Sequence, residues 1–162
     1  CETDYVAGGL GWRVWAAGVV MCRELVDRQL SIGVQGANVL EVGAGCGMAG
    51  FLAARLGASR VTFTDYLPGL LSNLDQSVAL NRNRNLGDGD PGAELRVQHL
   101  EWLCAAPGLL LEHAATRPMG GDGSCTPATA DVLASMASRG LPPGERFDLI
   151  LGSDVCYEDP LP

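Results

Sequence analysis

The chain has 162 residues, 47% of them hydrophobic, and this length and content fit a single globular domain over residues 1–162. Its formal net charge of −8 repels phosphate backbones and so disfavours nucleic-acid partners. No apolar run approaches about eighteen residues, and no secretory signal opens the chain. We therefore expect a soluble cytoplasmic protein, with the nucleus left open as a second compartment.

The first predicted element is an amphipathic helix within residues 12–30. Its apolar residues recur at intervals of three and four along the chain: Trp12, Trp15, Val19, Cys22, Val26 and Leu30. A short buried strand is expected at residues 37–42, followed by a turn rich in glycine. A second helix then covers residues 48–57 and closes with Gly57 near its C-terminal end.

The same order of strand and helix continues along the chain. A strand at residues 60–65 precedes helical spacing over residues 67–83, which the Gly- and Asp-rich stretch 86–92 ends. Further strands are expected at residues 94–102 and 146–154. Alternating strands and helices imply right-handed crossovers and a parallel sheet covered by helices on both faces. The predicted fold class is therefore α/β.

More than forty residues separate the third and fourth strands. Residues 117–129 are rich in Gly, Pro, Ser and Thr, so we expect a loosely ordered insertion at about 105–129. Residues 130–140 have the composition of a crossover helix. The chain begins with Cys1 and stops just after the fourth strand, which is typical of a fragment.

The cysteines give no sign of a metal site. All six are spread along the chain without a CxxC pair, which argues against a zinc site and against a disulfide framework. They are Cys1, Cys22, Cys46, Cys104, Cys125 and Cys156. We expect buried or incidental thiols and no bound metal.

The stretch "VLEVGAGCGMAG" combines an acid with alternating glycines. Gly43, Gly45 and Gly47 lack a Cβ, so backbone can approach a ligand there, and the following helix points its free N–H groups toward that ligand. Glu41 lies on the preceding buried strand, where a carboxylate is costly unless it is paired. A cationic ligand would supply the partner.

The same glycines also fit a rival reading. Gly45, Gly47 and Gly50 match the G-x-G-x-x-G fingerprint of NAD- and FAD-binding Rossmann domains. A diphosphate at the turn would face Glu41, and like charges about 4 Å apart repel by about 4 kcal/mol at an effective dielectric of ~20. S-adenosylmethionine carries a sulfonium and an ammonium instead, so Glu41 favours this cofactor, by direct contact or through water.

Polar residues also end the other predicted strands, and ligands of open parallel sheets bind at these carboxyl ends. Asp65 lies at the position of an acid that accepts the ribose hydroxyls. Trp102 is a candidate to stack on adenine, with Glu101 available to a polar edge. Ser153 and Asp154 follow the fourth strand. A helix cap, a core aromatic and a turn carboxylate remain the structural alternatives for these positions.

The motifs "WRVWAAG", "EVGAGCG", "TFTDY", "LEW" and "ILGSDVCY" occur in this order. The ordered set resembles the class I S-adenosylmethionine-dependent methyltransferases, and within them the methyltransferase-like protein-lysine methyltransferases. The resemblance runs from about Gly11 to Tyr157. It implies a Rossmann-like class I methyltransferase fold, here truncated after the fourth strand, because the family's sheet has three further strands.

The resemblance also implies roles for single residues. The cofactor would be lined by Trp15, Gly43, Ala44, Gly45, Asp65, Trp102 and Ser153, and Asp154 with Tyr157 would form the D-x-x-Y motif. Two positions depart from the usual pattern, since Glu101 stands where aspartate is common and Ser153 where a small apolar residue is frequent. Both changes are mild.

The activity expected from this set is methyl transfer to an amine nitrogen, most simply the lysine of a protein. Asp154 would position the incoming lysine, and the ring of Tyr157 would wall the channel. The Pro-Pro-aromatic sequence of many base methyltransferases is missing after Asp154, which favours a protein over a nucleic acid. We expect a monomer. An oxidoreductase-type Rossmann domain and an inactive fragment or binding module remain the alternatives.

Overall fold

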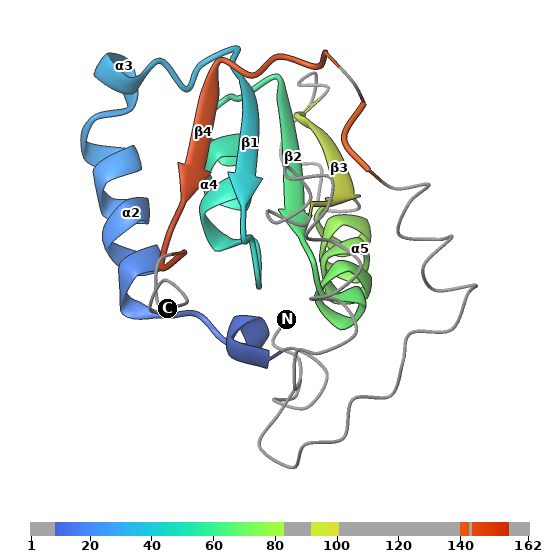
Figure 1. The fold of residues 1–162 in the computed structure, drawn as a ribbon. Coiled ribbons are helices and arrows are strands. Elements are labelled where there is room, and N and C mark those ends of the chain that lie inside the picture. The colour runs from blue at the N-terminus through green and yellow to red at the C-terminus, as the bar shows by residue number, and fades with distance from the viewer. Residues whose placement is uncertain (1–8, 83–91, 101–139, 143, 156–162) are drawn as a thin grey trace, which may run out of the picture.

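The computed structural model describes residues 9–82, 92–100, 140–142 and 144–155 (Figure 1). The elements in chain order are η1 (Gly9–Trp12), α2 (Ala16–Asp27), α3 (Gln29–Ile32), β1 (Asn38–Val42), α4 (Met48–Arg55), β2 (Arg60–Asp65), α5 (Pro68–Arg82), β3 (Glu94–His99) and β4 (Leu149–Gly152). Among these helices, none combines the length and the apolar character needed to cross a membrane.

The four strands form one parallel sheet in the order β3-β2-β1-β4. This is the strand order of the doubly wound Rossmann-like folds, so the predicted α/β class is confirmed. Strands β2 and β3 extend the sheet to one side of β1, whereas β4 pairs on its other side. The order therefore reverses between β1 and β4, and in such sheets a ligand binds outside the carboxyl ends of the strands at this point.

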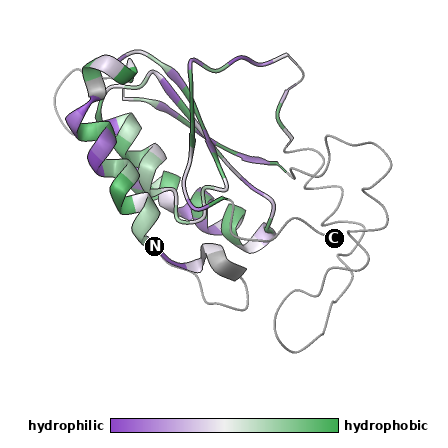
Figure 2. Ribbon diagram, turned by 60° about the vertical axis from the view of Figure 1, so that its left-hand side comes forward, coloured by the Kyte–Doolittle hydropathy of each residue, from purple (hydrophilic) through white to green (hydrophobic). Residues whose placement is uncertain are grey.

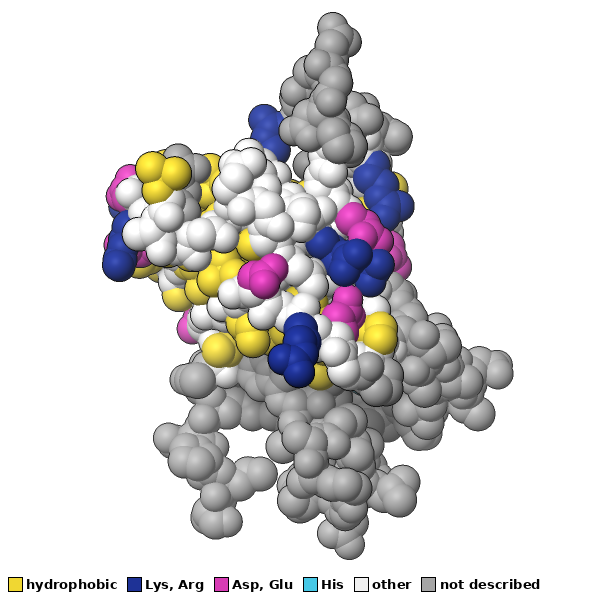
Figure 3. Space-filling model, turned by 90° about the horizontal axis from the view of Figure 1, so that it is seen from above, with side chains coloured by type: hydrophobic (Ala, Val, Ile, Leu, Met, Phe, Trp, Pro, Cys, Tyr) yellow, Lys and Arg dark blue, Asp and Glu magenta, His cyan; other side chains and the backbone are white. Residues whose placement is uncertain are grey.

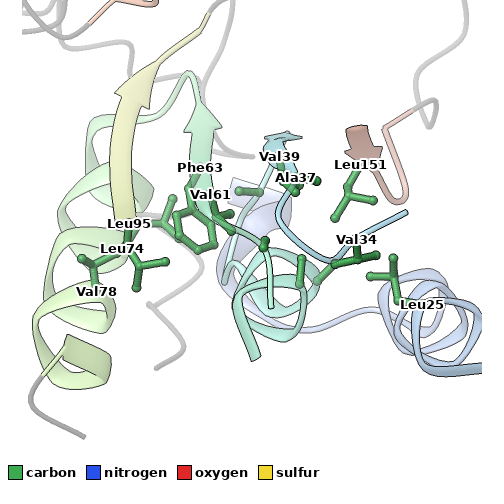
Figure 4. Close-up of a cluster of buried hydrophobic side chains, with 14 residues drawn as sticks. Leu25, Val34, Ala37, Val39, Val61, Phe63, Leu74, Val78, Leu95 and Leu151 are labelled. Carbon is green, nitrogen blue, oxygen red and sulfur yellow. The ribbon is translucent and has the colours of Figure 1, made fainter. Parts of the chain in front are cut away.

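The three longer helices α2, α4 and α5 pack on one face of the sheet (Figure 2). Parallel register aligns Val39, Val61 and Leu95 across β1, β2 and β3, and all three side chains are buried in the core beneath these helices (Figure 4). Phe63 and Leu74 join the same cluster. Of the crossover helix predicted at residues 130–140, residues 130–139 lie outside the described residues, and Gly140 forms an isolated parallel bridge with His99.

Helix α2 buries a different stripe from the predicted one. Its inner face carries Gly18, Met21, Cys22 and Leu25, and of the predicted apolar stripe only Cys22 belongs to it. Val19 and Val26 are exposed, and Leu30 is 94% exposed in α3. Trp12 and Trp15 precede the helix, which begins at Ala16. The prediction was wrong because a glycine adds nothing to an apolar pattern, whereas packing against α4 selects the stripe on which Gly18 lies.

Strand β4 is shorter than the predicted strand over residues 146–154. Residues before it still bind β1, because Asp148 accepts a hydrogen bond from the Asn38 backbone N–H at 2.9 Å. The Asn38 side-chain amide donates to the Arg146 carbonyl at 2.6 Å. These contacts fix where β4 enters the sheet, and its carboxyl end therefore lies beside that of β1.

Candidate active site at the carboxyl edge of the sheet

The turn from β1 to α4 is built from alternating left-handed glycines. Gly43, Gly45 and Gly47 have φ values of 59°, 52° and 73°, which residues with a side chain rarely adopt. A Cβ on Gly45 would lie 3.1 Å from the carbonyl oxygen of Gly11. A Cβ on Gly47 would meet side chains of α4, α5 and β2. At these two positions the packing of the chain itself requires glycine, in addition to the ligand approach that the sequence predicted.

Glu41 caps the helix that follows this turn. The N-cap residue of α4 is Gly47, which has no side chain to accept the free N–H groups of the first turn. Glu41 supplies the missing acceptor from β1: its Oε2 accepts the Gly50 N–H at 3.0 Å, and the Ala49 N–H also donates to it. The carboxyl group therefore has partners within the chain, and its burial alone does not require a cation.

Burial dominates the protonation of Glu41, whose side chain is only 4% exposed. Desolvation raises its pKa to about 8, while the N–H groups of Gly50 and Ala49 oppose the rise and the charge of Asp65 adds to it. Burial, and next the charge of Glu41, also raise the pKa of the Cys22 thiol in α2. A positive charge brought close to Glu41 would favour its ionised form.

Asp65 fastens the glycine turn to the end of β2. Its Oδ2 accepts the Gly45 N–H at 3.0 Å, and its Oδ1 accepts the N–H groups of Tyr66 at 2.8 Å and Leu67 at 3.3 Å. The N–H of Ala44 binds the Thr64 carbonyl at 2.9 Å. Asp65 thus lies at the predicted edge. Its contact with a ribose stays a prediction, because these hydrogen bonds of its carboxylate all come from the backbone.

Sequence reasoning missed a second layer over the turn, formed by the N-terminal segment. Gly11 in η1 packs against Gly45, since a Cβ on it would lie 3.3 Å from the Gly45 Cα and 2.5 Å from Leu70 in α5. The Cys46 thiol lies 3.6 Å from the Gly11 carbonyl oxygen as a weak donor. Within "GLGW", Gly11 was the sequence signal for this contact, because a close contact between two backbones needs a residue without a Cβ.

The same segment reaches the end of β4 a few residues later. A Cβ on Gly18 in α2 would lie 3.4 Å from Met48 in α4 and 3.6 Å from the Ser153 hydroxyl. Residues 11–18 thus connect the glycine turn with the end of β4, along the carboxyl edge (Figure 1). Trp15, the half-buried N-cap residue of α2, belongs to this segment.

Asp154 follows β4 in an unusual conformation. Its φ is 57°, and within the described part of the chain it is the one residue other than glycine with positive φ. Its side chain is exposed at the carboxyl edge, next to Ser153, which is half-buried. Such backbone conformations are costly and cluster at functional sites. The remaining predicted site residues, Glu101, Trp102 and Tyr157, lie outside the described residues.

The donor set at this edge favours a cation over a diphosphate. Free N–H groups at a helix N-terminus are what binds the diphosphate of a dinucleotide, but those of Ala49 and Gly50 already donate to Glu41. The carboxylate of Asp65 is a second acidic group at this turn, where it accepts the Gly45 N–H. The residues present therefore fit a nucleoside with positive charge better than a dinucleotide. In the described ranges no three His, Cys, Asp or Glu side chains gather as a metal site would require.

Comparison with known proteins gives a consistent set of relatives. A family model described as "Lysine methyltransferase" matches residues 2–114. Protein N-lysine methyltransferase METTL21A of Danio rerio is 30% identical over 154 residues, which cover 95% of this chain and 51% of the relative. EEF1A lysine methyltransferase 3 of Mus musculus is 35% identical over 94 residues, covering 58% of this chain and 36% of the relative.

The chain thus spans about half the length, or less, of these curated relatives. Among solved structures, magnesium protoporphyrin IX methyltransferase from Synechocystis PCC 6803 with bound SAH aligns with a TM-score of 0.42 and 14% identity. The alignment covers 62% of this chain and 41% of that chain.

Proposed function

Because the chain belongs to the lysine methyltransferase family, we propose that it is the cofactor-binding part of an S-adenosylmethionine-dependent enzyme that methylates a protein lysine. The observation that carries this proposal is the contact of Glu41 with the first turn of α4. It occupies two of the N–H groups at the helix N-terminus that a dinucleotide diphosphate would use. It also places an acidic side chain beside the turn where a sulfonium cofactor is held in this family. An oxidoreductase function is not favoured by this geometry.

S-adenosylmethionine, when bound, supplies a methyl group on a positively charged sulfur. The tasks of the protein are then to align the acceptor amine and to exclude water, because an in-line displacement depends mainly on geometry. Glu41 and Asp65 preorganise the turn, since their carboxyl groups hold the backbone N–H groups of Gly50 and Gly45. The first proposed role is therefore positioning through the backbone.

Asp154 is proposed to position the acceptor lysine. Its exposed carboxylate at the carboxyl edge suits an incoming ammonium group, and Tyr157 of the D-x-x-Y motif is proposed as the wall of the lysine channel. An ordinary lysine costs about 4.6 kcal/mol to deprotonate at pH 7, so the amine must lose its proton within the site. We propose that water accepts this proton.

The proposed acceptor is a protein and not a nucleic acid. The net charge of −8 repels phosphates, and the residues after Asp154 are Val, Cys and Tyr in place of the Pro-Pro-aromatic sequence. We further propose that the protein acts as a monomer in the cytoplasm, with the nucleus as an open second compartment. A substrate pool from both compartments would serve to identify the acceptor.

The deciding experiment has a binding arm and an activity arm. Calorimetric titration should show binding of S-adenosylhomocysteine and none of NAD, whereas the reverse would contradict the proposal. Incubation with methyl-labelled cofactor and cell lysate should then label lysines of a lysate protein. All eleven basic residues of this sequence are arginines, so its own band cannot carry methyl-lysine from these residues. Cofactor binding without any labelling would indicate a binding module.

A further inference from the structure

Arg13, in the link from η1 to α2, has its guanidinium over two indole rings. Its Cζ is 4.4 Å from the centroid of the Trp15 ring and 5.5 Å from that of Trp12, within the range of cation–π contacts. The residue is exposed, and no carboxylate of the described residues forms an ion pair with it. A guanidinium whose face rests on aromatic rings keeps its N–H edge available as a fork that fits a carboxylate.

The position of this link is fixed at both ends. Gly11 packs against Gly45 of the glycine turn, and Gly18 packs beside Met48 and Ser153. Arg13 therefore lies in the stretch of backbone that runs along the carboxyl edge from the end of β1 to the end of β4. This is the point of strand-order reversal at which a ligand of such a sheet binds.

The charges of the other described arginines lie elsewhere or are already paired. Arg55 and Arg82 belong to the last turns of α4 and α5, at the opposite edge of the sheet. Arg60 and Arg96 form ion pairs with Glu94 and Glu145. Figure 3 looks down on that opposite edge, where basic and acidic side chains lie side by side.

At the carboxyl edge of the sheet, acidic side chains outnumber basic ones among the described residues. Asp65 and Asp154 are acids at this edge, which suits the sulfonium and the ammonium of S-adenosylmethionine and disfavours its carboxylate. A cation at this edge would offset these acids for a ligand that carries both signs, and Arg13 is the arginine in the described N-terminal segment there.

We propose that Arg13, supported by Trp12 and Trp15, binds a carboxylate at this edge, and that the amino-acid carboxylate of S-adenosylmethionine provides it. The proposal rests on the proposed function. The two indoles are positioning residues, since they hold the guanidinium plane, and Arg13 makes the contact. An acidic side chain of the protein substrate offers the same chemistry and is distinguished by the test.

The test measures binding of two ligands to the protein and three variants by calorimetry. S-adenosylhomocysteine carries the amino-acid carboxylate, whereas 5′-methylthioadenosine lacks the amino-acid portion. Arg13→Gln should weaken S-adenosylhomocysteine binding about tenfold, the effect of losing a charge-assisted hydrogen bond, and leave methylthioadenosine binding unchanged. Arg13→Lys should recover only part of the loss. The control Arg23→Gln removes a charge from another exposed arginine, in α2, and should bind both ligands normally.

The outcomes separate the two sources of the carboxylate. If Arg13→Gln weakens the binding of S-adenosylhomocysteine but not that of methylthioadenosine, the carboxylate that Arg13 binds belongs to the cofactor. Normal binding with a lower rate of lysate labelling, not matched by Arg23→Gln, assigns the carboxylate to the protein substrate. Normal binding with normal labelling overturns the site. Failure of the unmodified protein to bind S-adenosylhomocysteine would instead remove the proposed function and this site with it.

Discussion

The side chain of Glu41 in β1 accepts a hydrogen bond from the Gly50 N–H in α4 at 3.0 Å, across the glycine turn that joins the two elements. The contact is possible because Gly50 has no Cβ, which would lie 2.5 Å from both Glu41 Oε2 and the Phe63 ring. Strand, turn and helix are thereby held in one geometry. The buried carboxyl group of Glu41 can therefore occupy its position only because residue 50 is a glycine.

Gly50→Ala should therefore destabilise the protein although alanine favours helices. The new methyl would displace the Glu41 carboxyl group or the Phe63 ring, and overpacking of this kind costs about 1–3 kcal/mol. Gly18→Ala, in α2, is the matched control, because the new Cβ would lie 3.4 Å from Met48, an ordinary van der Waals distance. That change should be neutral or stabilise by up to about 1 kcal/mol. Urea unfolding of both variants measures the difference, and equal stabilities would contradict the proposed contact.

Glu41 should give the stability a specific pH dependence. Its pKa is raised from an ordinary 4.5 to about 8, so the folded state keeps a proton that the unfolded state has released. The stabilisation is complete below about pH 4.5 and is lost as pH rises through about 8. One extra proton in the folded state corresponds to a loss of about 1.4 kcal/mol per pH unit over this range.

Glu41→Gln should remove this slope, because an amide oxygen still accepts the N–H groups but does not titrate. Urea midpoints of the unmodified protein and the variant, taken between pH 5.5 and 8, measure the effect. Glu24→Gln, which changes an exposed carboxylate of α2, controls for net charge. If the two Gln variants kept the same slope as the unmodified protein, the pKa of Glu41 would not be raised.

The sequence predicted the main elements and the edge at which the site lies. Strands at 37–42 and 60–65 and helices at 48–57 and 67–83 agree with the structure to within a few residues, because their apolar spacing and glycine or proline limits are local signals. The buried face of α2 was predicted wrongly, because packing against α4 decides which side of the helix is buried. Helix α4 follows α2 at some distance in the sequence, so local spacing does not reveal this contact.

The site residues were found more readily than their roles. Glu41 and Asp65 were identified as acids that need partners, yet those partners are backbone N–H groups, which the sequence does not reveal. Gly11 was missed because its role is a contact with Gly45, a residue distant from it in the sequence. Contacts of this kind depend on how the segments approach each other in space, and neither residue alone indicates them.

Gly45→Ala should weaken both stability and cofactor binding. The left-handed backbone costs roughly 1–2 kcal/mol for alanine, and the methyl would press on the Gly11 carbonyl at 3.1 Å. Gly33→Ala is the control, since Gly33 has a φ of 76° but nothing within 4 Å of its Cβ position. Only Gly45→Ala should reduce S-adenosylhomocysteine affinity in calorimetry, because only this change moves η1. An equal reduction in both variants would argue against the contact of η1 with the turn.

Asp154 offers a test in which stability and activity should change in opposite directions. Its φ of 57° is less favourable for a residue with a Cβ than for glycine, although Asp tolerates it better than most, so Asp154→Gly should stabilise the fold by about 1 kcal/mol. The same change removes the carboxylate proposed to position the acceptor lysine, so labelling of lysate proteins should fall at least tenfold. Asp154→Asn, which tolerates the left-handed backbone, should keep the stability and lose the activity. Thermal unfolding and methyl labelling, measured on the same preparations, distinguish these effects. If Asp154→Gly were more stable and also fully active, the Asp154 carboxylate would have no role in methyl transfer. Relief of backbone strain would then be the only effect of the substitution.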